Sequence, residues 1–274
     1  MGKVAPSNES IVQAEIRRWK ETPLWGIVLA LLQVAFMLVA FPALMKRYYA
    51  FLLNQGHPFY VTMFVTMALY IVALLWSNLT MFCIYKAKHP FFEQFRAEPN
   101  RQFLWEEDSS KWNSFVLRNI LILIFNVVIF FPLVSIMLTP DKEHLVFRYD
   151  IESWPTPWEM VWEIAFCSLC EDFMFYCTHR ILHTGWCYKH IHKLHHEQSQ
   201  PVSIGSEYAH PLEILISNFI PFYVGPVLLQ QRIHYVTLSL WGMYLVCEAV
   251  ENHCGYDFPW TPFRLIPFSG ECFS

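Results

Sequence analysis

The sequence is poor in charged residues. Of its 274 residues only 15% are charged, while 55% are hydrophobic and 18% are aromatic. A soluble domain of this length carries more charge, so the composition favours a membrane protein. The 19 basic and 23 acidic side chains give a net charge of -4 and leave no basic patch large enough to neutralise phosphates. We therefore expect no nucleic-acid partner.

Other features that the sequence lacks exclude further classes of protein. No internal repeat or low-complexity tract is visible, so we expect one membrane domain without a separate soluble one. The H-E-x-x-H helix signature of an intramembrane metalloprotease is missing. A metal transporter needs polar residues along several spans, and the first three apolar runs have almost none. The polar first twenty residues do not resemble a secretory signal.

The eight cysteines do not indicate a disulfide framework. Several of them lie in apolar helical patterns, where cysteine acts as a small hydrophobic residue. Cys167 and Cys170 form a C-x-x-C pair inside a continuous helical pattern rather than at a turn of the redox type. We therefore do not expect a redox or metal site at this pair.

Long apolar runs dominate the N-terminal half. Leu24–Met45, Tyr60–Tyr85 and Phe115–Leu138 are almost wholly apolar. At about 1.5 Å per residue, each run is long enough to cross a hydrocarbon core of roughly 30 Å. The segment 86–112 carries most of the lysines and arginines between these runs, which places it and the N-terminus in the cytosol by the positive-inside rule.

The C-terminal half predicts further helices. Pro157 can occupy the first turn of a helix that runs to about His183, which we interpret as a span or half-span. Leu212–Leu229 and Ile233–Val250 predict a helical hairpin, with both ends on the side of the histidines. The expected fold is all-α: a polytopic transmembrane helical bundle with a histidine-rich metal site that faces the cytosol.

A histidine-rich stretch, residues 171–196, holds six of the twelve histidines. His179 and His183 are four residues apart and share one face of a helix. Asp172 and Tyr176 precede them on the same stripe, where a carboxylate or phenol can hold an imidazole in one tautomer.

A second group of histidines follows the turn at Gly185. It has the pattern His-x-x-His-His at His192, His195 and His196, and a helix would bring His192 under the other two. Neutral imidazoles that converge in this way are ligands for a transition metal. Solvated or helix-capping histidines are the alternative; five at these two spacings favour a metal site. The predicted hairpin would bring His210 and His253 to the same place.

These motifs resemble those of the membrane-bound fatty acid hydroxylase superfamily. The similar segments are H-R-I-L-H at 179–183, Y-K-H-I-H-K-L-H-H-E at 188–197, E-Y-A-H-P-L-E at 207–213 and H-C-G-Y at 253–256. Within the superfamily the chain is most similar to the C-4 methylsterol oxidases, from about Glu171 onward. We accordingly divide the chain into an N-terminal transmembrane region, 1–150, and a hydroxylase-like domain, 151–274.

The resemblance implies a di-iron enzyme of the endoplasmic reticulum membrane. Such an enzyme oxidises a C–H bond of a sterol of the 4-methyl type or of a fatty-acyl lipid with O2. Its electrons come from NAD(P)H through cytochrome b5 or its reductase. The implied metal ligands are His179, His183, His192, His195, His196, His253 and His210. The carboxylates expected to accept hydrogen bonds from the N–H groups of these imidazoles are Asp172, Glu207 and Glu251.

The chain departs from the superfamily in one respect. A final H-D-x-H-H cluster is expected shortly after the G-Y-D segment, and the sequence stops at Ser274 about where that cluster should begin. Without His210, six ligands are too few for two fully held irons. We therefore expect a truncated gene model, splice form or fragment with impaired turnover, or a degenerate protein. The alternative function is an inactive lipid-binding or scaffolding relative with a partial metal site.

Overall fold

The computed structural model describes residues 11–100, 102–138, 146–197 and 201–265. The described residues form an all-helical bundle, and their only β-type contacts are two isolated bridges. Four helical segments are long and apolar enough to cross a membrane: Leu24–Leu53, Pro58–Ala87, Ser109–Met137 and Pro211–Arg232. The three spans predicted in the N-terminal half are confirmed, and the protein is a multi-pass membrane protein.

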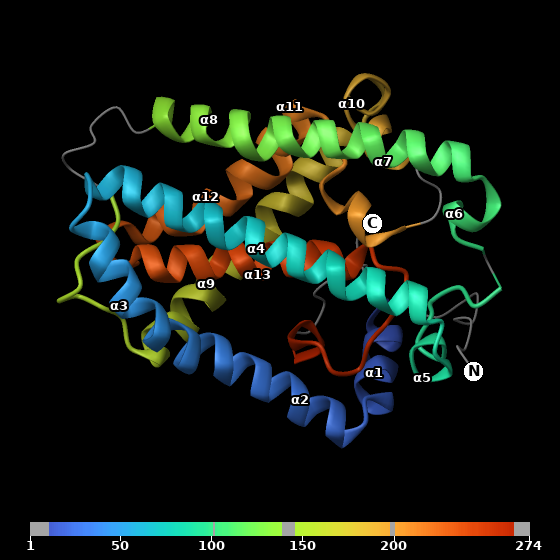
Figure 1. The fold of residues 1–274 in the computed structure, drawn as a ribbon, viewed down its shortest axis with the longest axis horizontal. Coiled ribbons are helices and arrows are strands. Elements are labelled where there is room, and N and C mark those ends of the chain that lie inside the picture. Colours follow the sequence, from blue (N-terminus) through green and yellow to red (C-terminus); the bar gives the residue numbers. More distant parts are fainter. Residues whose placement is uncertain (1–10, 101, 139–145, 198–200, 266–274) are drawn as a thin grey trace.

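The first and third spans are each built from several consecutive helical segments. α1 (Ile11–Glu21) is followed by α2 (Leu24–Ala35), the π-helical η1 (Phe36–Ala40) and α3 (Phe41–Leu53). The third span joins α7 (Ser109–Ile124), the π-helical η2 (Phe125–Phe130) and α8 (Phe131–Leu138). These two spans lie on opposite edges of the bundle in Figure 1.

The second span, α4 (Pro58–Ala87), lies against α13 (Tyr235–Asn252) in the middle of the bundle (Figure 1). The two helices are parallel, because Thr66 Oγ1 lies 2.7 Å from Ser239 Oγ and, further along both helices, Tyr85 Oη donates to Cys254 O at 2.8 Å. α4 ends at Lys88, which has a left-handed conformation with φ of 44°. The short helices α5 (Pro90–Glu93) and α6 (Leu104–Glu107) follow it.

The predicted helix before the first histidines is α9 (Pro157–Leu182). It begins at the predicted proline, with Thr156 as its N-cap and Glu159 completing a capping box. The fourth span joins α11 (Pro211–Glu213), the π-helical η5 (Ile214–Phe219), α12 (Ile220–Leu229) and the 3-10 turn η6 (Gln230–Arg232). The predicted hairpin consists of α12 and α13, but its arms have different main partners: α12 packs on α9, and α13 packs on α4.

The contact between α9 and α12 requires a glycine. A Cβ at Gly225 would lie 2.7 Å from Cys167 Cα and 3.0 Å from its Sγ. The close approach of these two backbones therefore depends on the missing side chain. It brings the fourth span against the helix that carries the first two histidines. The short elements α10 (Gly185–His190), η3 (His192–Glu197), η4 (Ser203–Glu207) and η7 (Pro262–Leu265) complete the described chain.

Candidate metal centre

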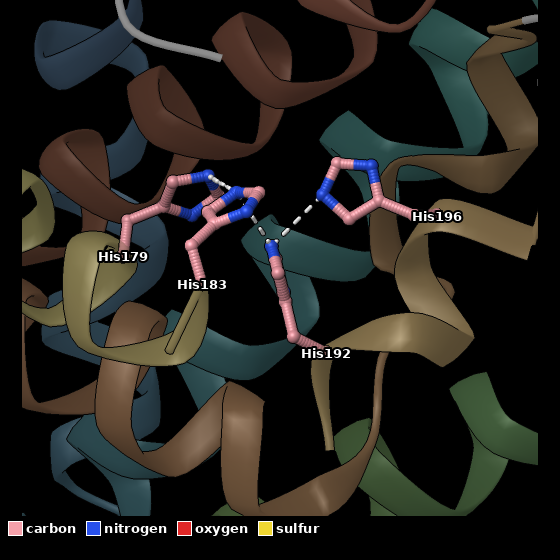
Figure 2. A group of neighbouring side chains, drawn as sticks. All are labelled: His179, His183, His192 and His196. Atoms are coloured by element: carbon pink, nitrogen blue, oxygen red, sulfur yellow. Dashed lines mark hydrogen bonds between the residues drawn. The ribbon is translucent and has the colours of Figure 1, made fainter. Parts of the chain in front are cut away.

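Four of the predicted histidines converge on one point at the end of α9. One ring nitrogen of each histidine lies within 4.8 Å of those of the other three. Figure 2 shows the four rings pointing toward one another. The Nε2 of His183 lies 3.1 Å from that of His179 and 3.2 Å from that of His192. The Nε2 of His192 also lies 2.9 Å from that of His196. The two histidine groups of the sequence thus contribute two members each.

The second histidine group was predicted to be α-helical, and the structure shows that it is not. Residues 192–197 form a 3-10 helix, which has about three residues per turn. His195 therefore stacks over His192, with ring planes 16° apart, while His196 directs its Nε2 toward that of His192. His195 turns toward a different partner, so the five histidines form two sets rather than one.

A buried carboxylate fixes the orientation of His192. The Nδ1 of this fully buried ring lies 2.8 Å from Glu213 Oε1 on α11. When the carboxylate accepts the Nδ1–H, the Nε2 of His192 keeps its lone pair and is free to bind a cation. Glu213 was not predicted for this role. Its position in the motif E-Y-A-H-P-L-E could have marked Glu213 as a candidate, but the sequence does not show which histidine this carboxylate faces.

The four-histidine set fits a metal ion better than a hydrogen-bonded cluster. If hydrogen bonds alone held the cluster, the Nε2 of His192 could only accept, and His183 and His196 would both have to donate to it. The Nε2–H of His183 would then be used by His192, so it could not also form a linear hydrogen bond with His179. Metal–nitrogen bonds of about 2.0–2.1 Å at tetrahedral angles place neighbouring nitrogens about 3.3 Å apart. The three Nε2 separations, 2.9–3.2 Å, are close to that value.

His195 and His253 form a second set beside the first. Their Nε2 atoms lie 3.3 Å apart. The Nδ1 of His195 faces the carbonyl oxygen of Tyr208 at 3.3 Å, and that of His253 faces the carbonyl oxygen of Ala249 at 2.8 Å. A carbonyl only accepts, so both Nδ1 atoms carry the proton and two Nε2 lone pairs face each other. Such a pair needs a shared cation or proton between its members.

The electrostatics of the second set favour neutral imidazoles. Burial, with a smaller effect of His253, lowers the pKa of His195 to about 3. Burial also lowers the pKa of His253. Both rings are therefore uncharged near neutral pH, which is the form that binds metal.

The backbone carbonyl of Tyr208 faces His195, and the side-chain hydroxyl of the same residue is also bound. Its hydroxyl donates to Glu197 Oε2 at 2.7 Å, and Glu197 pairs with Arg118 of α7 at 3.0 Å. The backbone carbonyl that faces His195 is thereby connected to the third span.

The structure places the other predicted residues elsewhere. His210 caps α11, where its Nδ1 accepts the Leu212 N–H at 3.1 Å, and it is not one of the four converging histidines. Tyr176 accepts a hydrogen bond from Arg180 at 2.7 Å. Within the described ranges, no hydrogen bond joins an imidazole to any of the three predicted carboxylates, Asp172, Glu207 and Glu251. The expectation about the last histidine box concerns the end of the sequence, and residues 266–274 lie outside the described residues.

A cavity of about 720 Å³ opens beside the histidines. Its lining includes Tyr235, the first residue of α13, and His253, which directly follows the last; they are about 27 Å apart at 1.5 Å per residue. The end far from the histidines is lined by aromatic and aliphatic side chains such as Phe59, Phe147 and Leu238. A long, mostly apolar cavity that leads to the converging histidines suits a lipid.

The fold and this centre define a multi-pass helical membrane protein with a cluster of histidines that could hold a metal ion. Residues 164–270 match the sequence profile of the fatty acid hydroxylase family. This region of the chain is thus similar to the fatty acid hydroxylase family, as the resemblance predicted. No solved structure matches the chain significantly.

Three curated relatives illustrate the similarity. The chain is 50% identical to methylsterol monooxygenase 2-1 of Arabidopsis thaliana over 120 residues, which is 43% of each protein. It is 35% identical to a protein of Dictyostelium discoideum named as a methylsterol monooxygenase, over 181 residues covering 66% of this chain and 63% of the relative. It is 42% identical to the very-long-chain aldehyde decarbonylase GL1-11 of Oryza sativa subsp. japonica, over 160 residues covering 58% and 56%. The chain thus spans between about two fifths and two thirds of these relatives.

Proposed function

We propose that the protein is a membrane-bound di-iron oxidoreductase that oxidises a C–H bond of a lipid with O2. Two adjacent sets of imidazole lone pairs, four in one and two in the other, support this proposal. The first set is His179, His183, His192 and His196, and the second is His195 and His253. Iron held there would supply the redox chemistry that acid–base side chains cannot supply for an unactivated C–H bond.

The protein's own residues bind the lipid and orient the imidazole rings. Glu213 and the backbone carbonyls of Tyr208 and Ala249 hold the Nδ1–H groups, so the Nε2 lone pairs point inward before any metal binds. The apolar walls of the cavity bind the lipid and exclude water, which positions a methyl or methylene group near the histidines. Two of the three relatives are named for a methylsterol, which supports a methylsterol as the lipid, and the resemblance of the motifs suggests the 4-methyl type.

We infer that the protein lies in the endoplasmic reticulum membrane with the histidines toward the cytosol. The five lysines and arginines of segment 86–112 support this orientation. Cytochrome b5 or its reductase would then deliver electrons from NAD(P)H at the cytosolic face.

Metal analysis of the purified chain tests the proposal. Two irons per chain, together with oxidation of a 4-methylsterol that stops when iron is chelated, are expected. One zinc or no metal per chain would instead support a lipid-binding or scaffolding protein. Oxidation that continues after the iron has been removed would refute the di-iron mechanism.

A further inference from the structure

One hydroxyl group joins the second span to two distant parts of the chain. Tyr85 lies near the end of α4 and is buried. Its Oη donates to the carbonyl oxygen of Cys254 at 2.8 Å and accepts the N–H of Ser203 at 3.2 Å. These partners follow it in the sequence by 169 and 118 residues. Both partner residues are buried as well, so removal of the hydroxyl would leave their backbone groups without this hydrogen bond.

The first of these contacts holds the backbone beside His253. Cys254 directly follows His253, which itself follows the last residue of α13. The Nδ1 of His253 already faces the carbonyl oxygen of Ala249 at 2.8 Å. The ring is thus held from α13, and the peptide that follows it is held from α4. Together these two contacts determine where the Nε2 of His253 points.

The second contact holds the backbone that faces His195. Ser203 is the first residue of η4, and Tyr208 directly follows the last. The turn is closed by a hydrogen bond from the N–H of Tyr208 to the carbonyl oxygen of Gly205 at 3.0 Å. Because the turn is this short, a shift at its first residue also moves the Tyr208 carbonyl, which lies 3.3 Å from the Nδ1 of His195. The phenol hydroxyl therefore acts on both members of the second histidine set.

The ring of Tyr85 is packed independently of its hydroxyl. Its centroid lies 5.1 Å from those of Phe103 and Trp105 and 5.9 Å from that of Tyr256. A phenylalanine would keep these ring contacts and lose only the two hydrogen bonds. The first histidine set has no comparable connection, since within the described ranges no hydrogen bond joins Tyr85 to residues 179–183 or 192–196.

We propose that Tyr85 is a positioning residue of the second histidine set: its hydroxyl holds the backbone beside His195 and His253 so that both imidazoles can bind one metal ion. This inference rests on the proposed function, because it requires a metal ion at that set. Metal–nitrogen distances vary by only about 0.2 Å among such sites, so a small shift of either segment weakens binding. The weakening is confined to the second set, whereas a general loss of stability would affect both sets.

Cobalt(II) titration of the metal-free full chain in detergent tests the proposal. The absorption change that His253→Ala abolishes identifies the second set, and competition with a chelator gives the dissociation constant of each set. Tyr85→Phe should weaken cobalt binding at the second set at least ~10-fold, as when an outer partner of a metal ligand is lost. Binding at the first set, whose His192 is held by Glu213 instead, should change less than about 2-fold.

Tyr256→Phe is the matched control. Tyr256 is buried in the same aromatic cluster, and its hydroxyl donates to Glu93 Oε1 at 2.8 Å. This variant also loses a hydrogen bond, but its partner helix α5 carries none of the six histidines. Both cobalt affinities should therefore stay within about 2-fold of the wild type. Thermal melts of the metal-free proteins compare the losses of stability in the two variants.

Three results would overturn the inference. One is an unchanged affinity of the second set in Tyr85→Phe. The others are equal weakening of both sets in Tyr85→Phe, or the same weakening of the second set in Tyr256→Phe, because either indicates a general effect on the fold.

The failure of this inference can be distinguished from the failure of the proposed function. Two cobalt ions in the wild type, with an unchanged second affinity in Tyr85→Phe, would overturn the inference alone. A wild-type chain that binds no metal at the second set would overturn both. A selective cobalt effect in a chain that oxidises no lipid when loaded with iron would refute the proposed function and leave the inference standing.

Discussion

Removing the carboxylate that faces His192 should weaken the metal centre without unfolding the protein. Glu213→Ala leaves the Nδ1–H of a fully buried ring without its acceptor, 2.8 Å away in the native protein. Loss of such an outer partner lowers metal affinity about 10- to 100-fold, or about 1.4–2.7 kcal/mol. This range agrees with the roughly 1.5–3 kcal/mol of a hydrogen bond to a charged group. Glu213→Gln keeps an acceptor but loses the charge, so its effect should be smaller.

Cobalt(II) is a suitable probe for this prediction, because its visible absorption reports coordination by nitrogen. Competition between the protein and a chelator of known affinity gives the dissociation constant of the tighter site. Glu251→Ala serves as the matched control, since in the described part of the chain Glu251 has no hydrogen bond to an imidazole. Thermal melts of the metal-free variants check folding. If Glu213→Ala binds cobalt within 2-fold of the wild type while remaining folded, the carboxylate does not orient His192.

Three further predictions concern the second histidine set, its titration and the packing of α9. His195→Ala or His253→Ala should lower the bound metal from two ions per chain to one, as measured by metal analysis, and two ions in either variant would contradict the assignment. Burial lowers the pKa of His195 to about 3 in the folded protein, whereas its pKa in the unfolded chain is about 6.5. The neutral ring's contribution to stability is therefore fully present above pH 6.5 and is lost as the pH falls from 6.5 toward 3. The melting temperature of the metal-free protein should therefore fall across this window, and less steeply in His195→Ala. Gly225→Ala should destabilise by about 1–3 kcal/mol, because its Cβ would lie 2.7 Å from Cys167 Cα, whereas Gly242→Ala meets Phe222 at an ordinary 3.6 Å. Unfolding in denaturant should separate these two variants, and equal midpoints would contradict the packing argument.

The sequence by itself determined the features that depend on local periodicity. Apolar runs of sufficient length predict membrane spans whatever their neighbours are, and the three in the N-terminal half were found. The pair His179 and His183 needed only the four-residue spacing of a helix, and the two rings do lie together, with Nε2 atoms 3.1 Å apart. The similarity of residues 164–270 to the fatty acid hydroxylase family likewise followed from short motifs, since each motif carries several specific residues at fixed spacing.

Only the tertiary structure decided how the histidines divide and what holds them. His195 pairs with a residue 58 positions away because α13 runs parallel to α4 and ends beside η3. Glu213 meets His192 because the start of the fourth span lies beside η3, whereas the predicted His210 caps the same short helix. A helical pattern specifies which residues share a face, but it does not specify which other helix that face meets. These contacts join segments far apart in the chain, so the packing of the bundle determines them.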